Sequence, residues 1–513
     1  MVTVARSDRQ YPDLTSGYNQ RWIGTPESVA MIESVEQVVH VVQEAVRDGR
    51  RISVNGAGHC FEDFVYNDDV DVVVNMKNLD GVYFDPRMNA VAVEAGANLL
   101  NVYEKLYESW GVTIPGGICY SVGVGGHVSG GGWGALCRKH GLVVDHLYAV
   151  EVVVVEKSGK ARSVVATREK GDPNRELWWA HTGGGGGNFG VVTRYWFRSP
   201  GSAGDTPDAL LPKPPSHVLL SAVSLPWNKI SEKEFFRLVS NYGDWHEANT
   251  RPDSGAAGLF GLLVLNHRSN GQIGLITQVD ATMPRAREIL DEYLAFLLRG
   301  VDSPVEPMTV SMGEYTAMPD CFEPQRLPWL QATRYLGTSN TELNNPTRRA
   351  DYKSGYMRRN FPDKHIATMY DSLTSTEIDN PSASMHLQGF GGRVNTVDSS
   401  STAFPHRNSV FKLYWQVLWS EADDDAKHLA WLRNFYGDLY QDTGGVPVPN
   451  DVTDGCYVNY PDIDLSSPEF NQSEVPWYRL YYKDNYERLQ QVKKTWDPRD
   501  VFRHAQSVRL PER

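Results

Sequence analysis

Glycine is distributed unevenly along this chain, and its clustering restricts the fold more than any other feature of the sequence. The 513 residues include 45 glycines. They concentrate in a short tract at Asn55–Cys60, a long one at Gly116–Gly134 and a third at Thr182–Gly190. Clustered glycine marks backbone that turns with positive φ or closely approaches another group. We therefore expect loops of glycine-rich backbone that close around a ligand.

The segments around these loops have the patterns of alternating strands and helices. Ser34 is a candidate N-cap with Gln37 at the capping-box spacing, and valines then recur with helical period, so we predict a helix over 33–47. Residues 99–110 form a second predicted helix. Short β-branched runs predict strands at 52–54, 72–74, 90–93, 150–155 and 191–197.

The residue composition changes after Ser199, where clustered proline and glycine indicate a linker over 200–215. Strand-like runs at 218–224, 258–265 and 274–281 then alternate with amphipathic helices at 232–243, 284–298 and 424–440. This pattern predicts an antiparallel sheet backed by helices, and hence an α+β unit. After a second linker at 444–449, a last helix is expected near 484–496. We expect domain segments at 1–205, 206–445 and 446–513.

Composition excludes several functional classes. The formal net charge of −13 argues against a nucleic-acid or anionic-membrane partner. No run approaches the roughly 18 apolar residues that cross a bilayer, and the first 21 residues do not have the pattern of a signal peptide. Five cysteines without a CxxC pair favour a reducing, cytoplasmic location, and no metal-ligand spacing is present. The carboxylates between residues 442 and 464 are expected to form a solvated loop.

The tract Gly185–Gly190 matches GxGxxG, but a strand-like run follows it where a dinucleotide-binding Rossmann unit needs a helix. A glycine loop against a flat or phosphate-bearing ligand is the better interpretation. Two reactive side chains, His59 and Cys119, stand on loops of the same kind, where backbone N–H groups can close on an anion such as a pyrophosphate. Either residue alone is more often structural.

Together with further motifs, these two residues resemble the berberine-bridge-enzyme-like branch of the vanillyl-alcohol oxidase superfamily. His59 and Cys119 lie 60 positions apart in matching surroundings. The other matching motifs are Trp178–Thr193, Thr402–His406, Tyr457–Asp462 and Trp496–Phe502. The resemblance implies a two-domain FAD-binding fold of α+β class. It also implies FAD attached twice, through 8α-histidyl and 6-S-cysteinyl bonds.

The resemblance also implies roles for individual residues. Tyr460 is the expected catalytic base, Tyr356 its partner from the substrate domain, and Tyr457 the alternative base. A small residue at Val122 favours oxygen access, and therefore an oxidase. The expected cofactor-binding residues are His59, Cys119, Gly56, Ala57, Gly58, Gly117, Val122, Gly123, Gly126, His127, Gly187, Asn188, Gly190, Val191 and Asn459. No metal is expected.

The substrate is inferred from the stretches Gly58–Phe64, Leu177–Thr193 and Gly444–Asp451, which are most similar to sugar-oxidising members in glycopeptide antibiotic pathways. They imply oxidation of a primary hexose hydroxyl on a glycosylated small molecule to aldehyde or carboxylic acid, with O₂ reduced to H₂O₂. Oxidation of a secondary or anomeric hydroxyl, or an oxidative cyclisation, is the alternative. A flavin-binding protein without turnover would not need Tyr460 or Val122. The chain could be a monomer or a homo-oligomer.

The match has departures from the family pattern. Asn55 and Ala57 replace an Arg and a Gly before the expected attachment histidine, and Trp133 stands where many relatives have Tyr. The match is weakest near residues 300–350 and 383–388, in the expected substrate domain.

Overall fold

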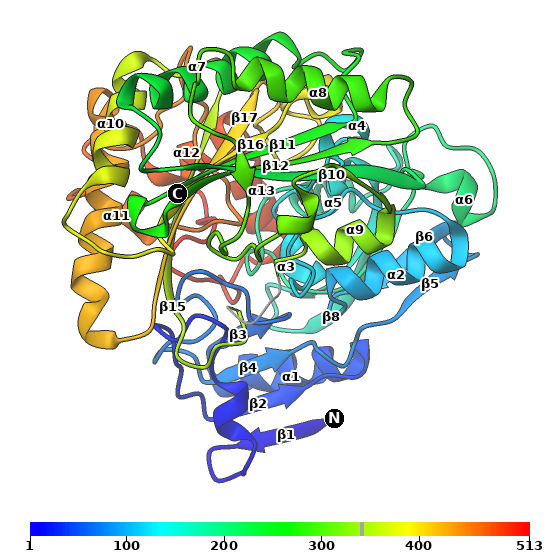
Figure 1. Cartoon of the computed structure of the whole chain (residues 1–513). Coiled ribbons are helices and arrows are strands. Elements are labelled where there is room, and N and C mark those ends of the chain that lie inside the picture. The colour runs from blue at the N-terminus through cyan, green and yellow to red at the C-terminus, as the bar shows by residue number, and fades with distance from the viewer. Residues whose placement is uncertain (339–342, 513) are drawn as a thin grey trace.

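Three β-sheets organise the chain, and the computed structural model describes residues 1–338 and 343–512 (Figure 1). The first sheet has the order β1 (Val2–Ala5), β2 (Ser28–Met31), β4 (Val72–Asn75), β3 (Ile52–Asn55). Strands β2, β4 and β3 are parallel. The carboxyl end of β3 runs directly into Gly56–His59, and ligands of open parallel sheets bind at such ends.

Helix α1 (Val35–Asp48) connects β2 to β3 and confirms the predicted N-terminal helix. The Ser34 hydroxyl accepts a hydrogen bond from the N–H of Gln37, so it caps the helix as expected. Gly49 ends the helix with φ +67°, a conformation that favours glycine.

The second sheet is antiparallel, with the order β5 (Val82–Asp85), β6 (Ala90–Glu94), β9 (Val191–Phe197), β7 (Leu147–Val155), β8 (Ala161–Thr167). The third glycine tract leads directly into β9, so the expectation that this GxGxxG is not a Rossmann motif is confirmed. Helices α2 (Leu99–Trp110) and α3 (Val124–Ser129) bury apolar side chains in the same hydrophobic core as this sheet. The long glycine tract lies between and after these two helices.

The third sheet has eight antiparallel strands in the order β13-β10-β12-β11-β16-β17-β15, with β14 beside β10. Their bounds are β10 (His217–Pro226), β11 (Leu259–Asn266), β12 (Gln272–Asp280), β13 (Glu306–Pro307), β14 (Gln325–Pro328), β15 (Arg349–Met357), β16 (Ser384–Gly389) and β17 (Phe411–Trp419). Helices α7 (Glu232–Ala248), α8 (Ala286–Leu297), α10 (Asp363–Thr374) and α11 (Asp425–Leu439) cover one face of it (Figure 1). The predicted α+β unit is therefore confirmed.

The C-terminal helices α12 (Trp477–Tyr482) and α13 (Tyr486–Trp496) follow the third sheet in sequence, but α13 packs against α5 (Arg175–Ala180). The remaining helices are α4 (Cys137–His140), α6 (Pro207–Leu210) and α9 (Trp329–Leu336). The domain boundaries at 205/206 and 445/446 stay predictions. Strands β13 to β17 lie in the stretch after residue 300, where no strand was predicted.

The expected solvated loop over residues 442–464 is wrong, because Asp454, Asp462 and Asp464 are buried. The Lys353 ammonium, from β15, lies 2.8 Å from the Asp462 carboxylate and 2.9 Å from that of Asp464. Arg433 binds Asp464 from the other side. Asp462 and Asp464 are thus buried beside cations of the third sheet and of α11, and Asp454 is buried beside Arg358 and Lys483.

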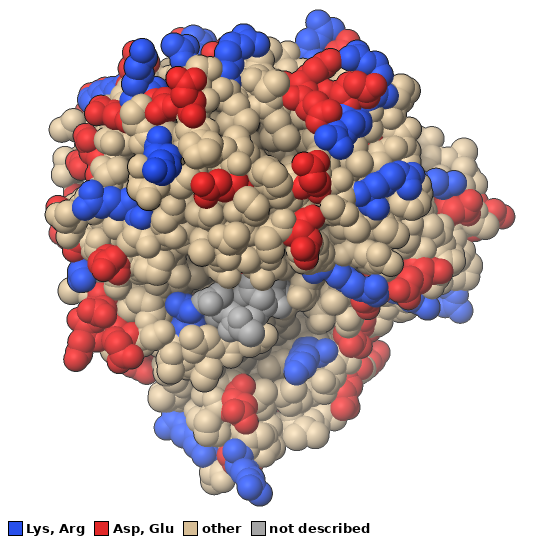
Figure 2. Space-filling model, viewed as in Figure 1, with Lys and Arg blue, Asp and Glu red and all other residues tan. Residues whose placement is uncertain are grey.

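Charged side chains of both signs lie on the surface of the molecule. Figure 2 shows acidic and basic side chains interspersed on the face in view. No described helix combines the length and apolar character needed to cross a bilayer. All five cysteines are free thiols, and the described His, Cys, Asp and Glu side chains form no metal-binding group.

We predict that Lys353→Met lowers the free energy of unfolding by about 3–5 kcal/mol, because it leaves two buried carboxylates without their shared cation. The matched control is Lys364→Met, which breaks an exposed pair with Asp442 and should cost about 0–1 kcal/mol. Urea denaturation of the purified proteins measures both changes. Equal losses in the two variants would contradict the assignment.

Candidate active site

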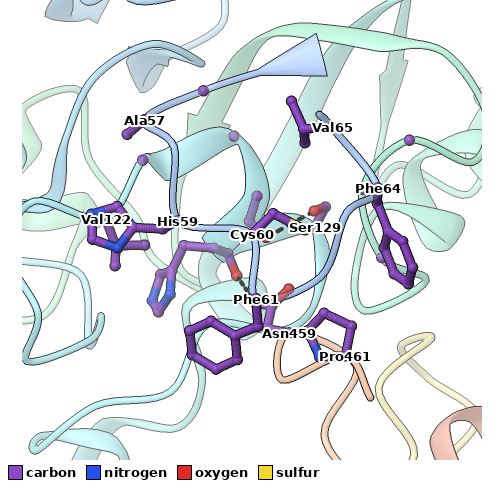
Figure 3. A pocket seen from close by; sticks show the side chains of 18 of the residues that line it. Ala57, His59, Cys60, Phe61, Phe64, Val65, Val122, Ser129, Asn459 and Pro461 are labelled. Carbon is purple, nitrogen blue, oxygen red and sulfur yellow. Dashed lines mark hydrogen bonds between the residues drawn. The ribbon is translucent and has the colours of Figure 1, made fainter. Parts of the chain in front are cut away.

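A cavity of about 360 Å³ lies where the first two sheets, the third sheet and the C-terminal segment meet. All fifteen predicted cofactor-binding residues line it, and so do Tyr457 and Tyr460. Figure 3 shows His59 and Phe61, from the loop after β3, beside Asn459 and Pro461 of the C-terminal segment. The structure therefore brings together residues that the sequence places up to 400 positions apart.

His59 and Cys119 lie on either side of one hydroxyl group. The Ser121 Oγ is 2.9 Å from His59 Nε2 and 3.8 Å from Cys119 Sγ. Burial lowers the pKa of His59 to about 4, so its imidazole is neutral at pH 7 and one ring nitrogen keeps a lone pair. A neutral imidazole and a thiol at the same end of the cavity are the two nucleophiles that a doubly attached ring requires.

The loop that carries His59 approaches its neighbours closely at two glycines. A Cβ placed on Gly17 would lie 2.4 Å from the carbonyl oxygen of Gly58, and one on Gly123 would lie 3.1 Å from the backbone nitrogen of Ala57. A side chain at Gly17 would therefore force the two loops apart, and one at Gly123 would require its neighbour to move by a few tenths of an ångström. A Cβ on Gly126 would meet no atom within 4 Å and would instead stand in space that the cavity offers to a ligand.

The third glycine tract is held in shape by Asn188, whose Nδ2 donates to the carbonyls of Gly184 and Gly185. Its Oδ1 accepts from the N–H of Val508. Asn188 therefore lines the cavity while it uses its carboxamide to tie the turn to the C-terminal end of the chain. Gly187 has φ +71°, which makes the turn tight.

The C-terminal segment reaches the cavity through Asn459. Its Nδ2 donates to the backbone carbonyl of His127 in α3 at 2.9 Å and lies 3.1 Å from the Tyr457 hydroxyl. The His127 Nε2 accepts the N–H of Gly117. This chain of hydrogen bonds fixes the long glycine tract against the segment that carries both candidate base tyrosines.

The side chain that the third sheet places against Tyr460 is Lys412 of β17. Its Nζ donates to the Tyr460 hydroxyl at 3.0 Å and lies 4.0 Å from the centre of the Trp133 ring. Lys412 is fully buried. Burial lowers the pKa of the Lys412 amine well below its usual value and raises that of the Tyr460 phenol. Burial therefore favours the neutral amine and the neutral phenol, joined by one hydrogen bond.

Tyr356, the expected partner of Tyr460, does not line the cavity. It is buried in β15, stacks on His406 with ring centres 4.4 Å apart, and packs edge-on against Tyr457. Its hydroxyl has no hydrogen-bond partner among the described residues. No hydrogen bond therefore joins Tyr356 to Tyr460, and Lys412 occupies the place that the resemblance assigned to a second phenol.

Lys412 is not among the site residues predicted from the sequence. The signal was present, because Phe411–Trp419 is a buried strand in which a lysine stands among large apolar residues. A charged residue is almost never fully buried unless it is paired. A single lysine within an otherwise apolar strand therefore indicates either that the segment is not a buried strand or that the lysine has a functional role.

These residues fit a flavin. Glycine backbone, two nucleophilic side chains at one end and stacked aromatic rings around Phe61 and Tyr460 suit a flat ring with a phosphate-bearing tail.

Comparisons with known proteins agree with this fit. The chain matches the FAD binding domain family over residues 26–163 and the family described as berberine and berberine like over residues 456–509. It is 45% identical over 512 residues to aclacinomycin-N/aclacinomycin-A oxidase of Streptomyces galilaeus, covering 100% of this chain and 90% of that protein.

Two solved structures are equally similar. CrmK, a flavoenzyme involved in shunt product recycling in caerulomycin biosynthesis, superimposes with a TM-score of 0.95 at 45% identity over 99% of both chains. A glycopeptide hexose oxidase complexed with teicoplanin gives 0.92 at 46% identity, over 99% of this chain and 98% of that one. The expected two-domain FAD-binding fold is confirmed, and the cofactor is FAD. Identity alone does not single out the glycopeptide enzyme as the functional equivalent.

We predict that Gly17→Ala lowers the flavin content of the purified protein, because the new Cβ must displace Gly58 and with it His59. The matched control is Gly171→Ala, where a Cβ would meet nothing within 4 Å. The ratio of flavin absorbance to protein absorbance measures the effect. Full flavin content in Gly17→Ala would show that the close approach of the two loops is not needed to hold the cofactor.

Proposed function

This chain belongs to the berberine-bridge-enzyme-like family of FAD-binding oxidoreductases, and we propose that it is a bicovalent FAD oxidase of a sugar hydroxyl. The substrate would be a primary alcohol of a hexose on a glycosylated natural product in antibiotic biosynthesis, oxidised to aldehyde and then carboxylic acid. The observation that carries the proposal is the buried hydrogen bond between Lys412 and Tyr460, because Tyr460 lines the same cavity as His59 and Cys119.

The proposed attachment residues are His59 for the 8α position and Cys119 for C6 of the flavin. Both line one end of the cavity and both approach the Ser121 hydroxyl, so a single ring could reach them together. FAD, when bound, takes up the two electrons and passes them to O₂. Two covalent bonds keep the ring in place during turnover and leave the rest of the cavity to a bulky substrate.

The chain's own contribution to the chemistry is proton removal. An alcohol has a pKa far above 7, so a positioned base must take its proton while hydride leaves carbon. Tyr460 is that base in our proposal. For Tyr460 to act as a base, its own proton must first pass to the adjacent Lys412 amine, and the resulting ammonium stabilises the phenolate that accepts the alcohol proton. The Trp133 ring, 4.0 Å from Lys412 Nζ, adds a cation–π contact to the charged amine.

Complete oxidation requires two cycles. In the first, RCH₂OH and O₂ give RCHO and H₂O₂. In the second, the aldehyde hydrate again offers an O–H and a transferable C–H, and a further O₂ gives RCOOH and H₂O₂. Val122 lines the cavity, and its small side chain supports access of O₂ to the ring.

Oxidation of a secondary or anomeric hydroxyl is the alternative. It is favoured by the near-equal similarity to aclacinomycin oxidase, CrmK and the glycopeptide hexose oxidase. The base would be the same, and the third sheet would decide which carbon is presented.

We predict that Tyr460→Phe slows flavin reduction about 10²–10⁴-fold in stopped-flow experiments, with a smaller effect on substrate binding. Tyr293→Phe removes another buried hydroxyl, from a residue that does not line the cavity, and serves as the control. Near-normal reduction in Tyr460→Phe would assign the base to Tyr457 instead.

Lys412→Met should move the acidic limb of the pH profile of flavin reduction to higher pH, because without the amine Tyr460 loses its proton only at higher pH.

The product tests the function directly. With a panel of glycosylated natural products and simple glycosides, we expect H₂O₂ release and a gain of about 14 Da on the sugar, with labelled water supplying the new oxygen. A product 2 Da lighter than the substrate that accumulates without further change would support the secondary or anomeric alternative. A panel that yields neither peroxide nor a mass change would contradict sugar oxidation.

A further inference from the structure

A stripe of polar side chains lies on the cavity side of the third sheet, on the neighbouring strands β16 and β17. Both strands are buried, so polar side chains are unexpected there. Residues two apart in a strand share a face, and so do their partners across an antiparallel pair. The stripe consists of the register pairs Ser384 with Gln416, His386 with Tyr414, and Gln388 with Lys412. The chemistry proposed above uses only Lys412.

Gln388 is the member of the stripe whose position most calls for an explanation. It is 3% exposed, it lines the cavity, and its Oε1 has no hydrogen-bond partner among the described residues. Leaving a buried polar atom unpaired is costly, so native proteins satisfy nearly all of them with protein, water or ligand.

Gln388 is also the cross-strand neighbour of the residue that hydrogen-bonds to Tyr460. It lies directly opposite Lys412 across the β16–β17 pair, and directly opposite residues have Cβ atoms about 4.5–5.5 Å apart. The Lys412 amine in turn is 3.0 Å from the Tyr460 hydroxyl. Gln388 and Tyr460 line the same cavity, so a substrate whose alcohol meets Tyr460 can present a neighbouring group to Gln388. The indole Nε1 of Trp133, which also lines the cavity, likewise has no described partner.

We propose that Gln388 is a specificity-determining residue that binds a second hydroxyl of the substrate, close to the CH–OH that is oxidised. A carboxamide offers both a donor and an acceptor, and a hydroxyl can satisfy both at once. A deoxy carbon satisfies neither and leaves the carboxamide unpaired. Sites built in this way reject substrates that lack the hydroxyl far more strongly than apolar pockets reject a missing methylene. This inference rests on the proposed sugar oxidation and deepens it to a polyhydroxylated sugar.

The same stripe provides a matched control. Gln416 is also a buried glutamine, two strand positions beyond Tyr414, and neither end of its carboxamide has a described partner. It does not line the cavity, and a Cβ on Gly313 would fall 1.5 Å from its Nε2, so the segment around Gly313 covers it.

The experiment compares wild type, Gln388→Met and Gln416→Met, each with covalently loaded flavin, by stopped-flow flavin reduction. The probes are p-nitrophenyl β-D-glucopyranoside and its 2-, 3- and 4-deoxy analogues. In wild type, one deoxy analogue should react about 10- to 100-fold less efficiently than the parent. Gln388→Met should lose a similar factor on the parent and little on that analogue, so that the discrimination disappears. Gln416→Met should keep the wild-type discrimination.

An equal loss on all four glycosides in Gln388→Met, or loss of discrimination in Gln416→Met as well, would overturn the proposal. Failure of the proposed function has a different signature, because the wild-type flavin would then be reduced by no glycoside. In that case the three proteins are compared on two alcohols: one that does reduce the flavin and carries a second hydroxyl, and its analogue that lacks this second hydroxyl. Selectivity lost only in Gln388→Met supports the inference, and unchanged selectivity contradicts it.

Discussion

The close approach of backbone to backbone between glycine loops is the constraint on which the rest of the structure depends. The Gly58 carbonyl lies where a side chain on Gly17 would stand, and Gly123 packs in the same way on Ala57. These contacts bring the loop of His59 and the loop of Cys119 to one hydroxyl, that of Ser121. Because the loops extend from the ends of sheet strands and helices, two rigid layers hold both nucleophiles at one end of the cavity.

The chemistry depends on a second junction, between this pair of layers and the third sheet. Asn459 ties the C-terminal segment to α3, and Lys353 ties the same segment to β15 through Asp462. Tyr460 lies between these two anchors, so its hydroxyl is held against the amine of Lys412. Burial disfavours the charged form of each group, so it lowers the pKa of the amine, raises that of the phenol and holds the two together as an uncharged, hydrogen-bonded pair.

The features predicted correctly from the sequence are those that depend on residues close together in the chain. α2 and β9 begin and end at the predicted residues, and the glycine loops showed where His59 and Cys119 are displayed. Lys412 could not be predicted, because its neighbours in β17 are mostly apolar and Tyr460 is 48 residues further along the chain. The buried aspartates were misjudged for the same reason: a carboxylate beside proline or glycine usually lies in a solvated turn, and only the tertiary fold brings Lys353 and Arg433 to them.

The central claim is that the two glycine loops hold one flavin ring by two covalent bonds, and mass spectrometry of the denatured protein tests it most directly. After acid precipitation and proteolysis under non-reducing conditions, we expect a single flavin to join the peptide of His59 to the peptide of Cys119. Substitution of either residue by alanine should leave the flavin on the other peptide alone. Release of all flavin from the wild-type protein on precipitation, or flavin mass on only one of the two peptides, would contradict the account.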